Sequence, residues 1–341
     1  AKPCAYWWWM GNSVTKEGLT ENLEKYSRAG MGGLHIVPIY GERGDEEYFI
    51  QYVSPEWMEM LAHTVAEAER LDMGIDMTSG TGWPFGGPLI DEEHAAKRFD
   101  VIEIREPGPF LPDEFFQRAL GVKLVSLAGY DQQGNYSEIP FTLDGEGKVN
   151  WESPGPGYKV YALIQQMTRQ KVKRAAPGGE GYVVDYFSRE ASQFYFRKFR
   201  KAFEETEFTL GKVRSFYNDS YEVYGANWTG DFPEQFEKLR GYSMMPFIRY
   251  FADTTTSDIK QRFRVDFQET ISDLLREEFS RDWVEASHSL GLKTRYQAHG
   301  SPGNLIDLYS LSDIPETESF GRSNFPIPGL RQDEDYQEEV F

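Results

Sequence analysis

The hydrophobic positions of the chain follow two alternating spacings, one typical of strands and one typical of helices. Three short runs are almost continuously apolar, which favours strands covered on both faces, as in a parallel sheet. These runs are residues 5–10 (AYWWWM), 32–40 (GGLHIVPIY) and 73–78 (MGIDMT). Between them, apolar residues recur at helical spacing. The first predicted helix is capped by Thr15 and ended by Gly30, and the second begins at Ser54 and Pro55.

This rhythm changes after the third apolar run and then returns. Residues 99–186 contain short β-like stretches such as VIEI and VKLVSL, separated by Gly and Pro clusters, which predicts an inserted β-rich subdomain. Helix and strand patterns alternate again after the insertion. The predicted elements there are a helix at 188–205, strands at 213–217 and 292–297 with a long helical region between them, a short helix at 304–311, and a sixth strand end at 312–318.

Strands that alternate with helices argue for a parallel sheet, and eight right-handed units of this kind close into a barrel. The predicted fold class is therefore α/β, a (β/α)8 TIM-like barrel with about six units present and an inserted β-rich subdomain. Three parts are predicted. Residues 1–98 form the first half of the barrel, 99–186 the insertion, and 187–341 an incomplete continuation of the barrel. The remaining two units are expected after Phe341.

Charge and composition narrow the range of partners. The chain has 36 Lys and Arg against 55 Asp and Glu, a net charge of −19, which opposes binding to nucleic acid and suits neutral ligands. A membrane-spanning helix is not predicted, because no run of about 18 apolar residues occurs. A single cysteine, Cys4, excludes an internal disulfide. Aromatic residues make up 15% of the chain. Sugar-binding clefts use such rings as flat platforms, although core packing is their more common use.

The first candidate for chemistry is the run NDSYE, which contains Asp219, Tyr221 and Glu222 and directly follows the predicted strand at 213–217. In a barrel of this kind, the reacting groups lie at the carboxyl ends of the strands. Cleavage of a glycosidic bond needs a carboxylic acid that keeps its proton near neutral pH. Glu222 beside an aromatic ring is a candidate for that acid, and Asp219 and Tyr221 are candidates for binding the substrate. A solvent-exposed or structural glutamate is the alternative.

Glu316 and Glu318 form a second candidate group. Their spacing places both side chains on one face of an extended segment, where a metal ion, a shared proton or sugar hydroxyls would relieve their repulsion. An exposed strand end, with both charges screened by water, explains the pair equally well. Asp313 precedes them and is a candidate for binding a hydroxyl or a cation, with capping of the preceding turn as the alternative.

Three more residues are candidates for contact with a ligand. His299 follows the predicted strand at 292–297 and can bind a sugar hydroxyl from there, although a lone histidine is more often structural. Trp83 lies in the run SGTGWPFGGP, which lacks the GK[ST] of a nucleotide-binding loop and fits a turn that offers a ring for stacking. Trp9 ends a tryptophan triplet whose first and third members share one face, with core packing as the alternative. No HExxH motif occurs, so a zinc site of the familiar kinds is not predicted.

Several long segments together resemble one known family. They are YWWWMGNSVTKEGLTENLEKYSRAGMGGLHI, SPEWMEMLAHTVAEAERLDMGIDMTSGTGWPFGGP, NDSYEVYGANWT with FEKLRGY, and QAHGSPGNLIDLYSLSDIPETESFG. These segments are similar to glycoside hydrolase family 106, the α-L-rhamnosidases, between about residues 6 and 320 and less closely across the insertion. The resemblance implies removal of terminal α-L-rhamnose from plant polysaccharides, pectic fragments or rhamnosides, by inversion and with calcium assistance. It also implies a bacterial periplasmic, cell-surface or secreted location.

The resemblance also implies roles for individual residues. Glu222 of NDSYE matches the general acid, and Glu316 and Glu318 of IPETE match active-site carboxylates. Either Glu318 is the base, or the base lies on a seventh strand after Phe341. The ligands of calcium are not identified. Two other functions stay open, a retaining glycosidase on the same barrel and a non-catalytic carbohydrate-binding protein. A carbohydrate is the expected partner in each case, and the sequence does not indicate the oligomeric state.

Overall fold

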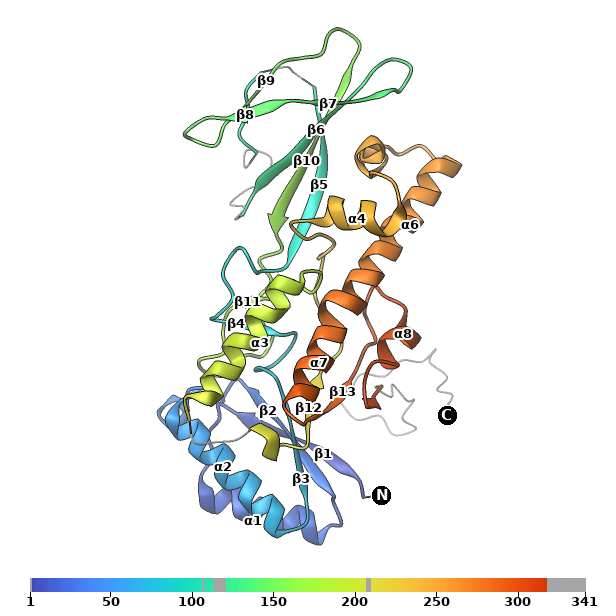
Figure 1. Ribbon diagram of the computed structural model, residues 1–341. Coiled ribbons are helices and arrows are strands. Elements are labelled where there is room, and N and C mark those ends of the chain that lie inside the picture. Colours follow the sequence, from blue (N-terminus) through green and yellow to red (C-terminus); the bar gives the residue numbers. More distant parts are fainter. Residues whose placement is uncertain (1, 106–107, 113–120, 207–209, 318–341) are drawn as a thin grey trace, which may run out of the picture.

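A six-stranded parallel sheet forms the base of the protein (Figure 1). The computed structural model describes residues 2–105, 108–112, 121–206 and 210–317. Within this part, the strands follow the order β1-β2-β3-β12-β13-β14, and every neighbouring pair is parallel. They are β1 (Cys4–Met10), β2 (Gly33–Ile39), β3 (Gly74–Thr78), β12 (Ser215–Asn218), β13 (Lys293–Tyr296) and β14 (Ile314–Pro315). The parallel sheet predicted from the apolar runs is thereby confirmed.

The sheet is open in the described part of the chain. There, β1 pairs with β2 alone and β14 pairs with β13 alone, so these two strands form the edges. The predicted (β/α)8 barrel, of which about six units were expected here, is therefore not confirmed by these residues. The architecture present is an open α/β sheet, because a barrel closes only when its first and last strands bond to one another.

Helices connect the parallel strands. They are α1 (Lys16–Arg28), α2 (Pro55–Arg70), α3 (Arg189–Glu204), α6 (Asp258–Leu274), α7 (Arg281–Ser289) and the short α8 (Leu305–Tyr309). All of these except α7, which continues from a π-helical turn, begin at a side-chain cap. The side chain of Thr15 accepts a hydrogen bond from the backbone N–H of Gly18 at 3.1 Å, and Ser54 accepts one from Trp57 at 3.2 Å. Each cap satisfies a backbone donor that the first helical turn leaves without a partner.

The two faces of the sheet differ in chemistry, because side chains alternate along each strand. One face packs against the helices. The ring of Trp9 lies 6.0 Å from that of Trp57 on α2, and the ring of Phe216 lies 5.8 Å from that of Phe199 on α3. The other face carries a row of polar and aromatic side chains from five strands, namely Tyr6, His35, Asp76, Tyr217 and Arg295. This polar face leads to the carboxyl ends of the strands.

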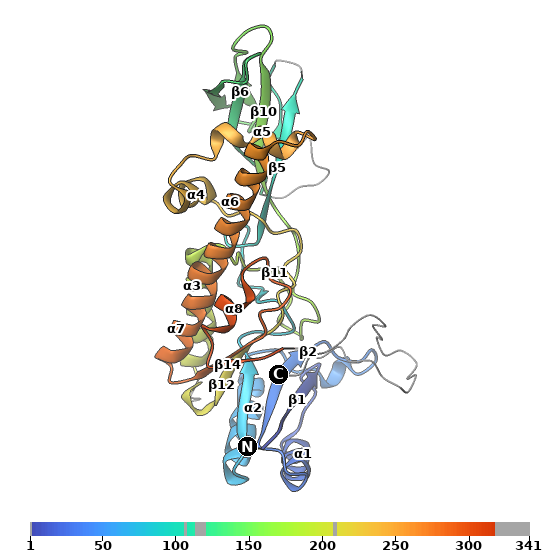
Figure 2. The same ribbon diagram turned by 90° about the vertical axis from the view of Figure 1, so that its right-hand side faces the viewer.

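A second, antiparallel sheet lies at the end of the molecule opposite α1 and α2, as both views show (Figures 1 and 2). Its strand order is β5-β10-β6-β7, with β5 (Lys97–Ile104), β10 (Lys159–Met167), β6 (Lys123–Tyr130) and β7 (Tyr136–Ile139). Helix α6 extends toward this sheet, and its Phe267 packs with a ring distance of 5.4 Å against Phe99 of β5. The chain thus leaves the parallel sheet after β3, forms the antiparallel sheet, and returns through residues 168–174.

The remaining elements are short. Two small antiparallel pairs are formed by β4 (Gly86–Gly87) with β11 (Tyr182–Val183), and by β8 (Phe141–Leu143) with β9 (Val149–Trp151). Helices α4 (Phe232–Arg240) and α5 (Arg249–Ala252) precede α6, and a π-helical turn (Leu275–Ser280) joins α6 to α7. Single 3-10 turns occur at Glu46–Tyr48, Leu210–Lys212 and Met245–Phe247. Among the residues described, none of the helices is long and apolar enough to cross a membrane.

Candidate active site

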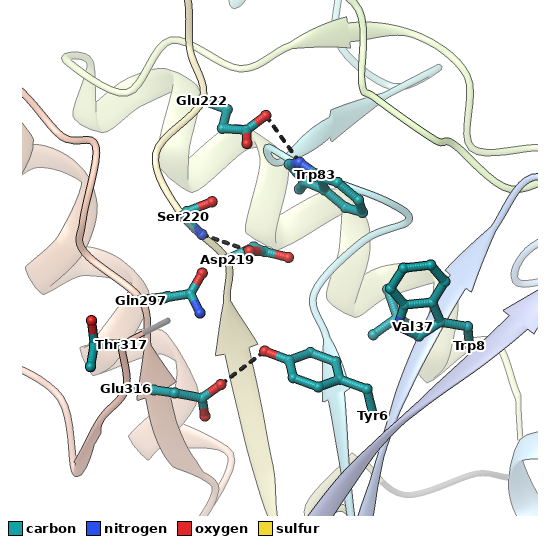
Figure 3. A pocket seen from close by; sticks show the side chains of 10 residues that line it. All are labelled: Tyr6, Trp8, Val37, Trp83, Asp219, Ser220, Glu222, Gln297, Glu316 and Thr317. Carbon is teal, nitrogen blue, oxygen red and sulfur yellow. Dashed lines mark hydrogen bonds between the residues drawn. The ribbon is translucent and has the colours of Figure 1, made fainter. Parts of the chain in front are cut away.

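A cavity of about 610 Å³ opens at the carboxyl ends of the parallel strands (Figure 3). The segments that follow β3, β12, β13 and β14 contribute to its wall, together with side chains of β1 and β2. Its lining residues are Tyr6, Trp8, Val37, Trp83, Asp219, Ser220, Glu222, Gln297, Glu316 and Thr317. Three of the predicted site residues after strands, Asp219, Glu222 and Glu316, therefore meet in one cavity, as does Trp83.

Glu222 is held by three donors. Its Oε2 atom accepts hydrogen bonds from Nε1 of Trp83 at 3.1 Å and from the hydroxyl of Tyr224 at 3.2 Å. The ammonium group of Lys173 also donates to this oxygen. Lys173 comes from the segment that returns from the antiparallel sheet, so the insertion contributes a charge directly to the site.

The return segment is fixed to the site through its backbone and one amide side chain. Trp83 and Lys173 exchange two backbone hydrogen bonds, with N–H to carbonyl distances of 3.1 and 2.7 Å. The amide nitrogen of Gln170 donates to the carbonyl of Glu222 at 2.6 Å, and its amide oxygen accepts from the backbone N–H of Tyr224 at 2.6 Å. These bonds hold the backbone on either side of the Glu222 side chain in place.

Gly82 allows this close approach. Its backbone has φ of +48°, and a Cβ atom there would lie 1.9 Å from the carbonyl oxygen of Lys173. Any other residue would therefore push apart the Trp83–Lys173 pairing. The glycine-rich run thus serves to bring Trp83 and Lys173 together beside Glu222.

The electrostatic surroundings keep Glu222 ionised in this structure. Burial alone raises the pKa of Glu222, yet the hydrogen bonds from Lys173 and Trp83 and the charge of Lys173 outweigh burial and hold the pKa below its usual value. A proton donor at neutral pH needs the opposite shift. The arrangement therefore fits a carboxylate that has to lose its contact with Lys173 before it can act as an acid.

Glu316 lies at the floor of the cavity and is anchored to the polar face of the sheet. Its Oε1 atom accepts a hydrogen bond from the hydroxyl of Tyr6 at 2.8 Å (Figure 3). Its Oε2 atom accepts one from Nε of Arg295 at 3.0 Å. Arg295 also donates from Nη1 to Asp76 at 2.7 Å, and Asp76 accepts from Nε of Arg214 at 2.8 Å. Charges of alternating sign thus connect Glu316 to the centre of the sheet.

His35 lies beside this network as a neutral side chain. Its ring is fully buried between Tyr6 and Tyr217, with ring distances of 4.9 and 4.4 Å. Burial and the positive charge of Arg295 lower the pKa of His35 to about 3. The imidazole therefore contributes packing and no charge at neutral pH.

The structure corrects the prediction for Trp9. Its side chain is only 1% exposed and packs against Trp57 on the helical face, whereas Trp8 is 51% exposed and lines the cavity. The alternation along β1 was visible in the sequence, but it did not show which face carries the site. Trp8 is the member of the triplet that a ligand can reach.

Asp313 also lies outside the cavity. Its Oδ2 atom accepts hydrogen bonds from the backbone N–H and the hydroxyl of Thr294, at 2.7 and 2.9 Å, and it is 2.9 Å from Nε2 of His288. Burial raises the pKa of Asp313, but the bonds from His288 and Thr294 outweigh this and lower it. Asp313 therefore joins β14 to β13 and α7, and its predicted contact with a ligand is not supported.

Tyr221 and His299 lie next to the site residues and contact each other through the backbone. The backbone N–H of Tyr221 donates to the carbonyl of His299 at 3.1 Å, and the ring of Tyr221 packs 5.6 Å from that of Tyr186. Burial raises the pKa of Tyr221 far above its usual value, so its hydroxyl stays protonated. Neither residue lines the cavity among those described. Glu318 lies outside the described residues.

Sequence reasoning missed several residues of the site, namely Tyr6, Trp8, Lys173, Tyr224, Arg295 and Gln297. Three of them carried a signal. Arg295 is a charge within an otherwise buried strand, and Tyr6 and Trp8 share one face of β1 by alternation. Lys173 carried no such signal, because its position depends on how the antiparallel sheet returns to the cavity.

Several known proteins are similar to this chain in sequence or in structure. A putative beta-glucuronidase from Formosa agariphila is 24% identical over 373 aligned residues, which cover 96% of this chain and 32% of that protein. The solved structure of a rhamnosidase from Novosphingobium sp. PP1Y superposes with a TM-score of 0.72 at 18% identity, covering 92% of this chain and 48% of that one. A beta-galactosidase from the psychrophilic Marinomonas ef1 gives a TM-score of 0.45 at 13% identity, over 94% and 41% of the two chains.

The chain thus spans 48% of the length of the rhamnosidase and 32% of the length of the putative beta-glucuronidase. The family described as alpha-L-rhamnosidase, glycoside hydrolase family 106, matches residues 1–108 and 136–334. This match includes β1 to β3, the whole segment from β10 to β14, and the carboxylates of the cavity. Because it extends over most of the sequence, the chain belongs to glycoside hydrolase family 106, the alpha-L-rhamnosidases.

Proposed function

We propose that the protein is a glycosidase that removes terminal α-L-rhamnose from plant-type glycans or rhamnosides, with Glu222 as the proton donor. The observation that carries the proposal is the meeting of Glu222 and Glu316, from the ends of β12 and β14, in one cavity of about 610 Å³ with an exposed tryptophan. Family membership and the fold of the Novosphingobium rhamnosidase support it. A cavity of this size suits a single sugar ring with its neighbouring linkage.

The proposed reaction is hydrolysis with inversion. A carboxylate base takes a proton from water, the water oxygen bonds to the anomeric carbon, and the bond from that carbon to the leaving oxygen breaks. Glu222 gives its proton to the leaving oxygen, and both carboxyl groups then exchange protons with solvent. Both oxygens of Glu316 already accept hydrogen bonds from Tyr6 and Arg295, so this residue suits binding sugar hydroxyls. We assign the base to Glu318 or to a carboxylate farther along the full-length chain.

We also propose that the open sheet is part of a (β/α)8 barrel. The edges of the sheet, β1 and β14, are where further strands would add. These strands would come from residues outside the described part, since the chain covers 48% of the rhamnosidase that shares its fold. A bacterial periplasmic or cell-surface location belongs to the same proposal by family membership.

Calcium assistance is a further part of the family-based proposal. Among the described residues, no group of three or more His, Cys, Asp or Glu side chains comes together as a metal site. The carboxylate oxygens of Glu316, and Oε2 of Glu222, are occupied by hydrogen-bond donors. The described residues therefore do not fit a calcium ion by themselves.

The test is hydrolysis of an aryl α-L-rhamnoside by the full-length protein and its Glu222→Gln variant. We expect turnover by the wild type and a loss of at least about 100-fold in the variant, because general acid catalysis contributes about 10²–10⁴-fold. Glu59→Gln is the matched control, since Glu59 of α2 also pairs with a lysine, Lys16 of α1, but does not line the cavity. Absence of turnover on any α-L-rhamnoside would contradict the proposal.

The anomeric form of the released sugar, followed by NMR, tests the mechanism. Inversion supports the reaction written above. Retention would contradict it and favour a retaining glycosidase that carries its nucleophile elsewhere. The ion pair between Lys173 and Glu222 favours one other candidate, a carbohydrate-binding protein without chemistry. Sugar binding by the full-length protein, together with zero turnover, would support that candidate.

A further inference from the structure

A strongly basic segment runs beside the cavity of this acidic protein. Residues 168–174 (TRQKVKR) include Arg169, Lys171, Lys173 and Arg174, four basic residues in seven, in a chain whose net charge is −19. The side chains of Arg169, Lys171 and Arg174 are exposed, and that of Lys173 is 35% exposed. A local excess of positive charge at the mouth of a cavity attracts an anion.

Two of these residues touch the wall of the cavity. The ammonium of Lys173 contacts Glu222, donates to the hydroxyl of Tyr224 at 2.7 Å and lies 4.3 Å from the centre of that ring. The guanidinium of Arg174 lies 5.6 Å from the ring centre of Trp83 and 5.5 Å from that of Tyr40. It also donates a hydrogen bond to the hydroxyl of Tyr40 at 2.7 Å. Both cations are thus held by aromatic side chains at the rim.

The interior of the cavity has the opposite charge. Its lining, within the described part of the chain, includes the carboxylates of Asp219, Glu222 and Glu316 and contains no lysine or arginine. A sugar that carries its own negative charge would be repelled there. The rhamnose of the proposed function is neutral and suits this interior, so a negative charge on the substrate would lie outside the cavity.

The position of Glu222 indicates where outside the cavity this negative charge would lie. A proton donor of a glycosidase lies between the sugar that is released and the sugar that leaves with the glycosidic oxygen. Lys173 contacts Glu222 but is not among the residues that line the cavity. Lys173 therefore lies beside the proposed proton donor and outside the cavity lining, with Arg174 as its neighbour in sequence, which is where the proposed function puts the leaving sugar.

We propose that Lys173 and Arg174 form a subsite for an anionic group, a carboxylate or a sulfate ester, on the leaving-group sugar. The substrate is then an acidic glycan that ends in a neutral sugar. This inference rests on the proposed function and specifies its substrate class. Ammonium and guanidinium groups are the donors that carboxylates and sulfates bind in proteins.

The subsite also explains how Glu222, which Lys173 keeps ionised, becomes protonated for its role as proton donor. An anion that binds Lys173 competes with Glu222 for the same ammonium group, so the carboxylate loses the donor that keeps it ionised. Glu222 can then take a proton from solvent and donate it to the leaving oxygen. A substrate with an anionic leaving sugar thus prepares its own proton donor, whereas a neutral leaving sugar leaves Lys173 in place.

The experiment compares kcat/KM of the full-length protein for three α-L-rhamnosyl disaccharides, whose leaving sugars are glucuronate, glucose and a glucose sulfate. We expect one or both acidic substrates to exceed the neutral one by about 10- to 100-fold, the effect of one hydrogen bond to a charged group. The acidic substrate with the larger value distinguishes a carboxylate from a sulfate subsite. In Lys173→Met, the ratio of acidic to neutral kcat/KM should fall to near one, and Lys173→Arg should restore part of it.

The matched control is Lys16→Met, which removes the lysine of another Lys–Glu pair, located between α1 and α2, and should keep the wild-type ratio. Arg174→Met provides a second variant in case Lys173→Met does not fold, which a melting curve shows, and it should also lower the ratio. Equal kcat/KM for acidic and neutral substrates in the wild type would overturn the subsite while the rhamnosidase function stands. No turnover of any of the three would overturn both.

Discussion

Lys173 and Glu222 meet although one follows the antiparallel sheet and the other follows the parallel sheet. The ammonium of Lys173 donates to Oε2 of Glu222, and Trp83 donates to the same oxygen from a third segment. The β-rich insertion is therefore part of the site. Its return segment sets the charge state of the carboxylate that we assign as proton donor.

The first prediction concerns the pH dependence of activity. Lys173 lowers the pKa of Glu222, so Lys173→Met should raise it. A proton donor acts only while protonated, and its activity disappears as the pH rises through its pKa. With a neutral aryl α-L-rhamnoside, the alkaline limb of the pH profile should therefore move to higher pH in Lys173→Met. A limb that stays in place, in a variant that folds normally, would contradict the control of Glu222 by Lys173.

The second prediction separates the two neighbouring tryptophans of β1. Trp9 is buried against Trp57, so Trp9→Ala should lower the free energy of unfolding by about 3–5 kcal/mol. Trp8 is exposed in the cavity wall, so Trp8→Ala should leave the melting temperature nearly unchanged and weaken sugar binding by about tenfold. Thermal denaturation and titration calorimetry measure the two effects. A stable Trp9→Ala or a strongly destabilised Trp8→Ala would show that the two faces are wrongly assigned.

The contrast between these tryptophans shows what the sequence could predict. Continuous apolar runs are compatible with strands covered on both faces and located the first three parallel strands, and the alternation of helix and strand patterns located the other three. The rule that reacting groups lie at the carboxyl ends of the strands then predicted Glu222 and Glu316 as site residues. Both line the same cavity. Alternation along a strand defines two faces but does not say which of them packs against helices. Trp9 was therefore placed on the wrong side.

The position of Lys173 could not be predicted for a different reason. It depends on contacts between residues far apart in the chain, such as the backbone pairing of Lys173 with Trp83. Local spacing carries no information about such contacts. Asp313 is a related case, because its carboxylate satisfies Thr294 on the neighbouring strand. Asp313 precedes β14 and does not line the cavity, whereas Glu316 follows β14 and lines it.

The third prediction tests the glycine that permits the Trp83–Lys173 pairing. Gly82→Ala should disturb this pairing, since the added Cβ would lie 1.9 Å from the carbonyl of Lys173. We expect a loss of stability above the ~1 kcal/mol that a positive φ costs an alanine, together with reduced activity. Gly30→Ala is the control, because Gly30 also has a positive φ but no atom within 4 Å of the added Cβ. Equal effects of the two substitutions would argue against a role for this contact.

The fourth prediction concerns Asp76, the carboxylate at the centre of the polar face of the sheet. Asp76 is fully buried and accepts hydrogen bonds from Arg295 at 2.7 Å and from Arg214 at 2.8 Å. Burial raises the pKa of Asp76, but the bond from Arg214 and the charges of both arginines outweigh burial and lower it. The folded state therefore binds a proton at this carboxylate less readily than the unfolded state does.

The sign of the pH effect follows from this shift. The stabilisation by Asp76 is complete above the unfolded pKa of about 3.9 and is lost as the pH falls through the lower folded value. Asp76→Asn removes one partner of a buried ionic group, which should cost about 3–5 kcal/mol at pH 7 and flatten the acid limb of the melting temperature. Asp72→Asn, at an exposed carboxylate near the end of α2, should change neither. An unchanged melting temperature of Asp76→Asn at pH 7 would contradict this prediction. It would mean that Arg214 and Arg295 find other partners, and that Arg295 holds Glu316 without help from Asp76.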